Sequence, residues 1–392
     1  MQRVLITGFG IVSPLGRDGA ENLKSLWNGS DCISPVNVFD VSKSRCRTAG
    51  QVQNTWLAKP KTRRQRRLDR SSLMMIQAVR EMMRTSSQIK PETLVVATSS
   101  GAMSKGEQFY RSLVTGKNRA GAARQVANYL PQKPVLDVQE EFNWRVPAHI
   151  ISNACASGTN AVGHAFHLVR AECHDVVLCG GYDPLSEMVF TGFDSLQAAT
   201  SEKIRPFDRD RSGLVLGEGA AVLLLESERS AVARHVTVFG EIVGYGVSTD
   251  NYHPTQPHPS GIGPRLAMQR ALADAGLDAG QIDYVNAHGT ATIFNDATEG
   301  IAISELMPGA AVSSTKSMMG HALGGAGAIE AVFSLLAIMH QLIPPNINFR
   351  QPEPGWKFRV VGNKAEPAKI RRVISNSFGF GGLNASLILQ AA

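Results

Sequence analysis

Residues 151–163 read ISNACASGTNAVG, an apolar run followed by a cysteine and then by small residues and glycine. An apolar run that gives way to such a pattern is typical of a strand, a turn and a helix in succession. The first backbone N–H groups of a helix have no partner inside the helix, and together with the helix dipole they favour an anion beside them. Cys155 stands at that place, so the pattern predicts a nucleophilic cysteine with an easily formed thiolate.

Similar units recur along the whole chain, and no long linker separates independent modules. Strands are predicted at 3–12, 93–99, 148–154, 176–181, 219–227, 236–248, 284–288, 358–363, 371–379 and 384–390. Helices are predicted at 71–84, 156–172, 264–276 and 327–341. Strands that alternate with helices indicate an α/β protein whose sheets are largely buried.

The two halves of the chain show a weak duplication. CASG at 155–158 and HALG at 321–324 each open a long apolar helix, and LVVATSSGA at 94–102 resembles YVNAHGTAT at 284–292. These matches predict two copies of one α/β unit, 1–235 and 236–392, whose equivalent turns face each other. The alternative is chance similarity between short segments rich in glycine and alanine.

Two histidines lie in glycine-bounded turns and not on apolar helix faces: His288 in NAHGTAT and His321 in MMGHALGG. One cysteine with two such histidines suits acyl-thioester chemistry, in which two N–H donors hold an enolate oxygen. It also suits a cysteine hydrolase, which needs only one histidine and an orienting Asn or Asp. Their spacing in the sequence favours neither reading.

Composition limits the class of protein. The chain has 392 residues, of which 43% are hydrophobic and 19% charged, as in ordinary globular proteins. We expect no membrane span, because no apolar run in the sequence approaches the required length. Five cysteines without CxxC spacing and ten histidines without an HExxH motif predict no disulfide framework, no metal and a reducing compartment, the cytoplasm.

Positive charge is concentrated at residues 61–70, KTRRQRRLDR, within a chain of net charge +7. Such a cluster favours an acidic partner. A nucleic acid is not expected, because neither an aromatic stacking platform nor a helix-turn-helix pattern accompanies the cluster. An acidic protein surface fits better, and a solvated basic face is the alternative.

Six ordered motifs resemble those of the β-ketoacyl-acyl carrier protein synthases, of the elongating type, over essentially the whole chain. The motifs are NACASG (153–158), PFDRDRSGLVLGEGA (206–220), VNAHGTAT (285–292), NDATE (295–299), STKSMMGHALGGAGAIE (314–330) and NSFGFGG (376–382). The resemblance implies a thiolase fold, in which two similar halves form a five-layered αβαβα sandwich. It also implies decarboxylative Claisen condensation of malonyl-carrier protein with an acyl chain on Cys155, in fatty acid or type II polyketide biosynthesis.

The resemblance also assigns roles to individual residues. The implied catalytic residues are Cys155, His288 and His321, supported by Lys316 and Glu330. The backbone N–H groups of Cys155 and Phe380 are implied as the oxyanion hole, and the Phe380 ring as a gate. The implied pantetheine contacts are Thr290 and Thr292, and the implied docking residues for the acyl carrier protein are Arg63, Arg66, Arg67 and Arg205. No metal or other cofactor is implied.

Some positions depart from the family pattern. Met319 and Leu383 stand where threonine is usual, and SSGAMSKGE and RSGLVLGEGA replace commoner sequences. These departures leave the acyl substrate open, including an aryl polyene or another polyketide. The partner in the dimer is a second copy or a paralogue without the cysteine. A non-catalytic chain-length partner and a thiolase or initiating synthase are the alternative functions.

Overall fold

The computed structural model describes residues 2–57, 62, 65–86, 89–116 and 122–392. Eleven strands in this part of the chain form one hydrogen-bonded sheet. In spatial order they are β12 (Arg359–Val360), β10 (Ala311–Ser313), β9 (Tyr284–Asn286), β14 (Arg372–Gly379), β15 (Leu383–Gln390), β8 (Gly240–Thr249), β1 (Val4–Val12), β7 (Gly219–Ser227), β6 (Val176–Asp183), β4 (Thr93–Ala97) and β5 (Ala148–Ile151).

The sheet consists of two repeats that meet at a short seam. From the seam outward, one repeat has the order β1-β7-β6-β4-β5 and the other the order β8-β15-β14-β9-β10. In both, the first three strands pair antiparallel and the last three pair parallel. The seam between β1 and β8 joins only residues 4–6 to residues 240–242. The two halves therefore share one topology, and residue 235 lies between helix α8 (Glu228–Arg234) and β8.

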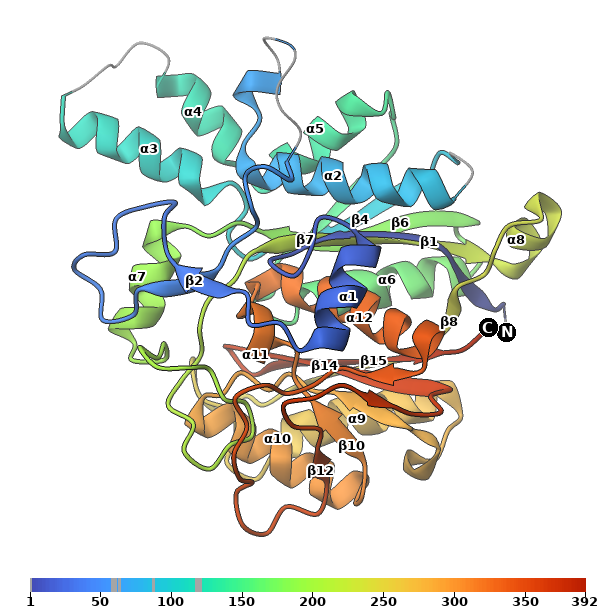
Figure 1. Ribbon diagram of the computed structural model, residues 1–392. Coiled ribbons are helices and arrows are strands. Elements are labelled where there is room, and N and C mark those ends of the chain that lie inside the picture. Colours follow the sequence, from blue (N-terminus) through green and yellow to red (C-terminus); the bar gives the residue numbers. More distant parts are fainter. Residues whose placement is uncertain (1, 58–61, 63–64, 87–88, 117–121) are drawn as a thin grey trace.

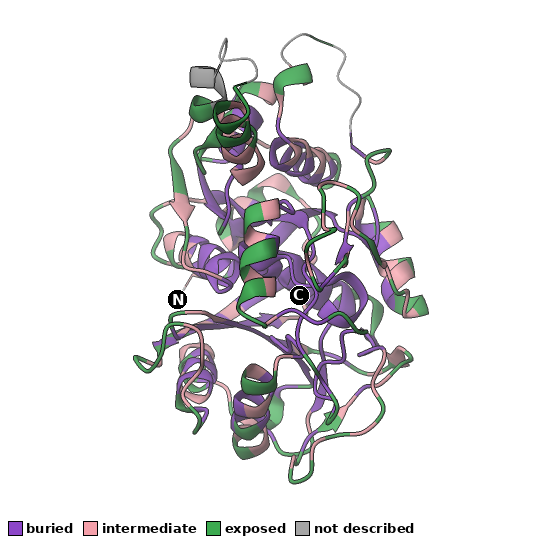
Figure 2. Ribbon diagram, turned by 90° about the vertical axis from the view of Figure 1, so that its left-hand side faces the viewer, coloured by how far each residue is buried: buried purple, intermediate pink, exposed green. Residues whose placement is uncertain are grey.

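Helices and sheets alternate as five layers (Figure 1). Helix α2 (Arg70–Thr85) covers the outer face of the first repeat, while α9 (Ile262–Ala275) and α10 (Ile293–Leu306) cover that of the second. Between the sheets lie α6 (Ser157–Arg170) and α12 (Ala326–His340), which contact each other. The predicted αβαβα architecture is confirmed, and the centre of the molecule is its most buried layer (Figure 2).

Helix α12 corrects one expectation about membranes. With the turn before it, Leu323–His340 is long and apolar enough to cross a bilayer by length and composition, although no such run was expected. However, 89% of this stretch is buried inside the fold. It is apolar all round because α6 and both sheets surround it, as expected for a core helix.

Short elements surround this frame. The other helices are α1 (Gly19–Asn28), α3 (Met103–Val114), α4 (Ala122–Tyr129), α5 (Lys133–Glu141), α7 (Glu187–Ser195) and α11 (Lys316–Met319). Two small hairpin-like pairs are β2 (Ile33–Pro35) with β3 (Thr48–Gly50), and β11 (Leu342–Ile343) with β13 (Glu366–Pro367). The strand predicted at 358–363 is only the two-residue β12, because it lies at the sheet edge and pairs only with β10.

Candidate active site

Cys155 lies in a tight turn between β5 and α6. The preceding Ala154 has φ of 54°, a left-handed conformation that is uncommon for a residue with a side chain. Hydroxyl groups from two segments hold this turn, because Ser157 Oγ and Ser99 Oγ both donate to the Ala154 carbonyl, at 2.6 and 3.0 Å. The strained turn displays the sulfur at the start of the helix, as the sequence predicts.

The thiolate is harder to form than expected. Cys155 is only 7% exposed, and burial raises the pKa of its thiol to about 11. The Lys316 ammonium and the Phe380 N–H lower this pKa, but less than burial raises it. The expectation of an easily formed thiolate was wrong for this geometry, because desolvation of a charged sulfur outweighs the first helical N–H groups.

His288 follows β9, at the position that Thr98 and Ser99 occupy after β4 in the other repeat. Its backbone N–H donates to Glu299 Oε1 at 2.9 Å, and the N–H of Gly289 donates to Glu299 Oε2 at 2.8 Å. Glu299 lies on α10 and is fully buried. One carboxylate therefore holds the backbone of the turn that carries His288.

His321 occupies the turn before α12, at the position of Cys155 before α6. Its N–H donates to the Val215 carbonyl at 2.8 Å, and its own carbonyl accepts from the Gly217 N–H at 2.9 Å. Gly320, with φ of 75°, lies against the backbone of Leu216, where a Cβ would come within 2.6 Å. A glycine is required at position 320, because a side chain would clash with this backbone. The LGEGA segment thus packs closely against the GHALGG segment and holds the turn that carries His321.

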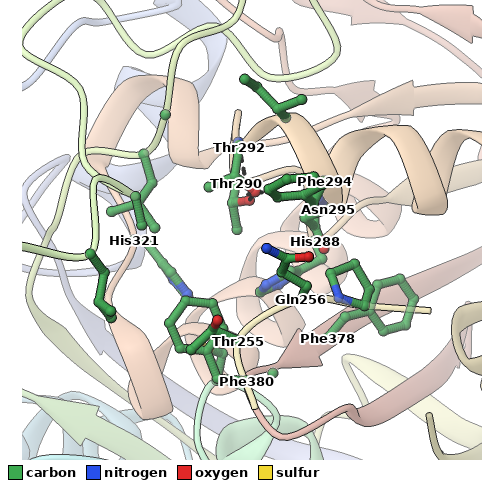
Figure 3. Close-up of a pocket in the computed structure, with 18 of the residues that line it drawn as sticks. Thr255, Gln256, His288, Thr290, Thr292, Phe294, Asn295, His321, Phe378 and Phe380 are labelled. Carbon is green, nitrogen blue, oxygen red and sulfur yellow. Dashed lines mark hydrogen bonds between the residues drawn. The ribbon is translucent and has the colours of Figure 1, made fainter. Parts of the chain in front are cut away.

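The three predicted catalytic side chains meet in space. The Cys155 sulfur and ring nitrogens of His288 and His321 all lie within 4.8 Å of one another. The centroids of the two imidazole rings are 5.2 Å apart, and the ring planes are nearly perpendicular. Both rings border one cavity (Figure 3). Burial and the nearby Lys316 charge hold the pKa of both histidines well below the usual value. Both rings are therefore neutral near pH 7, with nitrogens available as proton donors or acceptors.

Lys316 and Glu330, the two implied supporting residues, form a buried ion pair. Lys316 Nζ donates to Glu330 Oε1, and the two residues are 1% and 2% exposed. The pair supplies a fixed positive charge beside the catalytic groups, because Lys316 lowers the pKa values of Cys155 and both histidines. Neither side chain lines the cavity, so they act on the catalytic residues electrostatically.

Phe380 fits both of its implied roles. Its backbone N–H and that of Cys155 are both directed at the Cys155 sulfur and lower its pKa. A carbonyl oxygen on an acylated sulfur would lie close to the same two donors. The Phe380 ring stacks on Phe193 of α7, with centroids 5.5 Å apart and planes at 23°. Phe193 was not singled out from the sequence.

The cavity beside these groups has a volume of about 180 Å³. Thr290 and Thr292 line its wall, and their hydroxyl groups lie 2.9 Å apart (Figure 3). Asn295, the first residue of the NDATE motif, also lines it, as does Gln256, which belongs to none of the six motifs. A narrow wall of hydroxyl and amide groups suits a pantetheine arm, which carries amides and a thioester.

The predicted docking arginines divide into three cases. Arg66 and Arg67 are exposed on the short 3-10 helix Gln65–Arg67, and no ion pair is found for either among the described residues. Arg63 lies outside the described residues. Arg205 is only 7% exposed and pairs with Glu202, so its assignment to a docking surface was wrong. Its neighbours Ile204 and Phe207 are in the core and draw the chain inward.

Asp183, at the end of β6, is a site residue that the sequence did not reveal. It is fully buried and accepts hydrogen bonds from Thr98, Ser99 and Ser100 after β4. It also accepts from the N–H of Gly324, three residues after His321, at 2.6 Å. One carboxylate thus connects the Cys155 side of the site to the His321 side. Only its position after a predicted strand could have drawn attention to it.

Replacing Asp183 by asparagine should loosen both turns. The new NH2 group would face N–H donors, which leaves buried donors unsatisfied at a cost of about 1–3 kcal/mol. Loss of the negative charge should also lower the pKa of the Cys155 thiol, which Asp183 raises. Urea unfolding and the pH dependence of Cys155 alkylation measure the two effects. Asp175→Asn, at a surface ion pair, is the control; an alkylation profile shared by both variants would contradict the prediction.

Comparisons with known proteins agree with this geometry. Residues 1–231 match the model of the β-ketoacyl synthase N-terminal domain, and residues 239–350 match that of the C-terminal domain. The chain belongs to the β-ketoacyl synthase family. It is 35% identical over 406 residues to 3-oxoacyl-[acyl-carrier-protein] synthase 2 of Staphylococcus aureus strain COL, covering 99% of this chain and 98% of the relative.

Solved structures of β-ketoacyl synthases have the same fold. The ishigamide ketosynthase/chain length factor matches with a TM-score of 0.92 and 32% identity, covering 100% of this chain and 99% of that one. A second match has a TM-score of 0.90 and 26% identity and covers 100% of both chains. It comes from a structure of a type II polyketide acyl-carrier protein in complex with its ketosynthase bound to the hexaketide. The two family matches leave residues 232–238 between them, an interval that contains residue 235 between α8 and β8.

Proposed function

We propose that this β-ketoacyl synthase elongates an acyl chain by decarboxylative condensation with malonyl-acyl carrier protein. The observation that carries the proposal is the meeting of Cys155, His288 and His321 within 4.8 Å beside one cavity. A cysteine hydrolase would need one histidine held by an orienting Asn or Asp. Here the Nδ1 atom of His288 and both ring nitrogens of His321 have no partner among the described residues. Two imidazoles whose nitrogens lack protein partners are better suited to hold an enolate oxygen than to form a hydrolase triad, in which an Asn or Asp orients the histidine.

The first half-reaction transfers the acyl chain to Cys155. A neutral imidazole takes the thiol proton as the sulfur attacks the thioester of the acyl-carrier protein, so a free thiolate does not have to form before the attack. The oxygen of the tetrahedral intermediate receives the N–H groups of Cys155 and Phe380. The carrier thiol leaves with a proton, and the acyl chain stays on the sulfur.

The second half-reaction forms the carbon–carbon bond. Malonyl-carrier protein loses CO2, and ring N–H groups of His288 and His321 hold the thioester enolate oxygen. The enolate carbon attacks the acyl carbon on Cys155, the carbon–sulfur bond breaks, and the sulfur regains a proton. The product is a 3-oxoacyl chain, two carbons longer, on the carrier protein. The protein's own residues supply each donor, so we propose that the reaction needs no metal or cofactor.

Cys155→Gln tests whether the histidines carry out decarboxylation without the cysteine. The glutamine removes the nucleophile and leaves both histidines in place, so malonyl-carrier protein should still lose CO2, at least as fast as in the wild type. Release of labelled CO2 and mass spectrometry of the carrier protein measure this step. Cys155→Gln combined with His321→Ala is the control and should lose it. Equal decarboxylation by both variants would refute the role of His321.

The acyl carrier protein is the proposed partner of the basic cluster. Arg66 and Arg67 are exposed, and no ion pair is found for either among the described residues. The family resemblance implies an acidic carrier protein as the partner. Charge reversal at Arg66 and Arg67 should weaken binding of the carrier protein, more at low salt than at high salt. Calorimetric titration at two salt concentrations measures it. Reversal of Arg359, which faces Glu366 instead, is the control; unchanged affinity in the Arg66 and Arg67 variant would rule out docking there.

The acyl chain is proposed to extend past the phenylalanine pair. Helices α3, α4 and α7, the last of which carries Phe193, line a largely apolar groove of about 980 Å³. Its lining includes Tyr110, Val126, Tyr129 and Met188, all exposed in the single chain. Mass spectrometry of the acyl group trapped on Cys155, after mixing with candidate acyl-carrier proteins, identifies the substrate and separates fatty acid from polyketide biosynthesis.

Assembly with a second ketosynthase chain is proposed for the open edge of the sheet. Strand β5 ends the eleven-stranded sheet, and its first two residues are exposed, as in strands that another chain completes. The partner is a second copy or a paralogue without the cysteine.

A chain-length role for this chain itself is disfavoured, because Cys155 and both histidines are present and assembled. All five cysteines are free, which fits the cytoplasm as the proposed compartment.

A further inference from the structure

The catalytic side chains also have the composition of a metal site. The sulfur of Cys155 and ring nitrogens of His288 and His321 lie within 4.8 Å of one another. In tetrahedral zinc sites Zn–S is about 2.3 Å and Zn–N about 2.0–2.1 Å, which places neighbouring ligand atoms roughly 3.5 Å apart. A contraction of roughly 1 Å would bring all three atoms to bonding distance of one ion.

The histidine rings are arranged for such a contraction. Their planes cross at 82°, so the rings are not stacked, and one nitrogen of each lies within 4.8 Å of the Cys155 sulfur. The Nδ1 atom of His288 and both nitrogens of His321 are buried without a partner among the described residues. Buried polar atoms without partners cost free energy, which a bound ion would recover. The backbones are held by Glu299 and Val215, so only side-chain torsions need to change.

The donor set selects the class of ion. One thiolate and two imidazoles suit Zn²⁺, whereas Mg²⁺ and Ca²⁺ need oxygen ligands. The Lys316 charge opposes a cation here. However, Glu330 pairs with Lys316, and the thiolate formed on binding adds a further negative charge. The His nitrogens also lack the second hydrogen bond that supports most zinc ligands, so binding should be reversible and not structural.

We propose that Cys155, His288 and His321 form a reversible Zn²⁺ site that holds the protein in an inactive state. On binding, the thiol releases its proton to solvent, the sulfur and one nitrogen of each ring bond to the ion, and water completes the coordination. No oxidation or reduction takes place. The ion occupies the sulfur that takes the acyl chain and the nitrogens that hold the enolate. The inhibition rests on the proposed function, whereas the binding does not.

Cobalt replacement tests the binding. Titration of tag-free protein with Co²⁺ should produce a sulfur-to-cobalt charge-transfer band and the visible bands of tetrahedral cobalt. Loss of a ligand should weaken binding by more than about 100-fold, since even outer-shell partners cost 10–100-fold. Cys155→Ala should therefore lose the bands, whereas Cys173→Ala, at an exposed cysteine beside His174, should keep them. Bands that survive in Cys155→Ala, or that never form, would overturn the site.

Alkylation of the unaltered protein provides a test without any substitution. Zn²⁺ should protect Cys155 from iodoacetamide, and Cys173 in the same molecule is the internal control. Equal alkylation of Cys155 with and without Zn²⁺ would refute the proposal. The two ideas fail separately: condensation without protection refutes only the zinc site, and cobalt binding by a protein that never condenses refutes only the proposed condensation.

Discussion

Cys155→Ala is expected to abolish acyl transfer and condensation while the fold persists. The sulfur is the atom proposed to receive the acyl chain, and no other cysteine lines the cavity. Removing one buried sulfur atom leaves a small void, so the free energy of unfolding should fall by only about 1 kcal/mol. Mass spectrometry after incubation with acyl-carrier protein should find no acyl adduct on the variant, and urea unfolding measures the stability.

Cys179→Ala is the matched control for this experiment. Cys179 is also fully buried, and burial raises its pKa above that of Cys155, but it lies within β6 and away from the cavity. This variant should lose similar stability and keep acyl transfer. Normal elongation by Cys155→Ala would overturn both the nucleophile and the proposed reaction.

The duplicated topology explains why the proximity of Cys155 and His321 could be predicted from the sequence alone. Turns that follow equivalent strands in two copies of one unit must lie on equivalent edges, and the repeats meet face to face across α6 and α12. The similarity of CASG and HALG therefore predicted that Cys155 and His321 lie close together in space, although they are 166 positions apart in the sequence. The four predicted helices correspond to α2, α6, α9 and α12, which have long apolar periodic stretches, whereas shorter helices and the 14-residue α10 were not predicted. Strand β10 was missed because its three residues lack a pattern.

Other features depend on packing that no local pattern encodes. The raised pKa of Cys155 arises from its burial in the assembled site, whose cavity is lined by residues from both halves of the chain. Arg205 was assigned to the docking surface by the family resemblance alone, yet the chain turns into the core at Ile204 and Phe207. Asp183 gains its role only when the loop after β4 and the turn after His321 close around it.

Lys316→Ala is expected to have the largest effect on stability. Lys316 and Glu330 are both nearly inaccessible, and Glu330 Oε2 already lacks a partner among the described residues. Breaking a buried ion pair by removing one member costs about 3–5 kcal/mol, because the other charge stays buried without its partner. Removing Lys316 should also raise the pKa of Cys155, which the ammonium lowers, and slow acyl loading. Urea unfolding and the rate of Cys155 acylation measure the two effects.

The double substitution Lys316→Met and Glu330→Leu separates structure from chemistry. Replacing both members of a buried pair by apolar residues of similar volume is often neutral or stabilising, so the unfolding free energy should return close to the wild-type value. The positive charge stays absent, and acyl loading should remain as slow as in Lys316→Ala. If the double variant instead recovered both stability and loading, the ion pair would serve only to hold the His321 turn. Recovery of stability alone would show that the Lys316 charge acts on Cys155 itself.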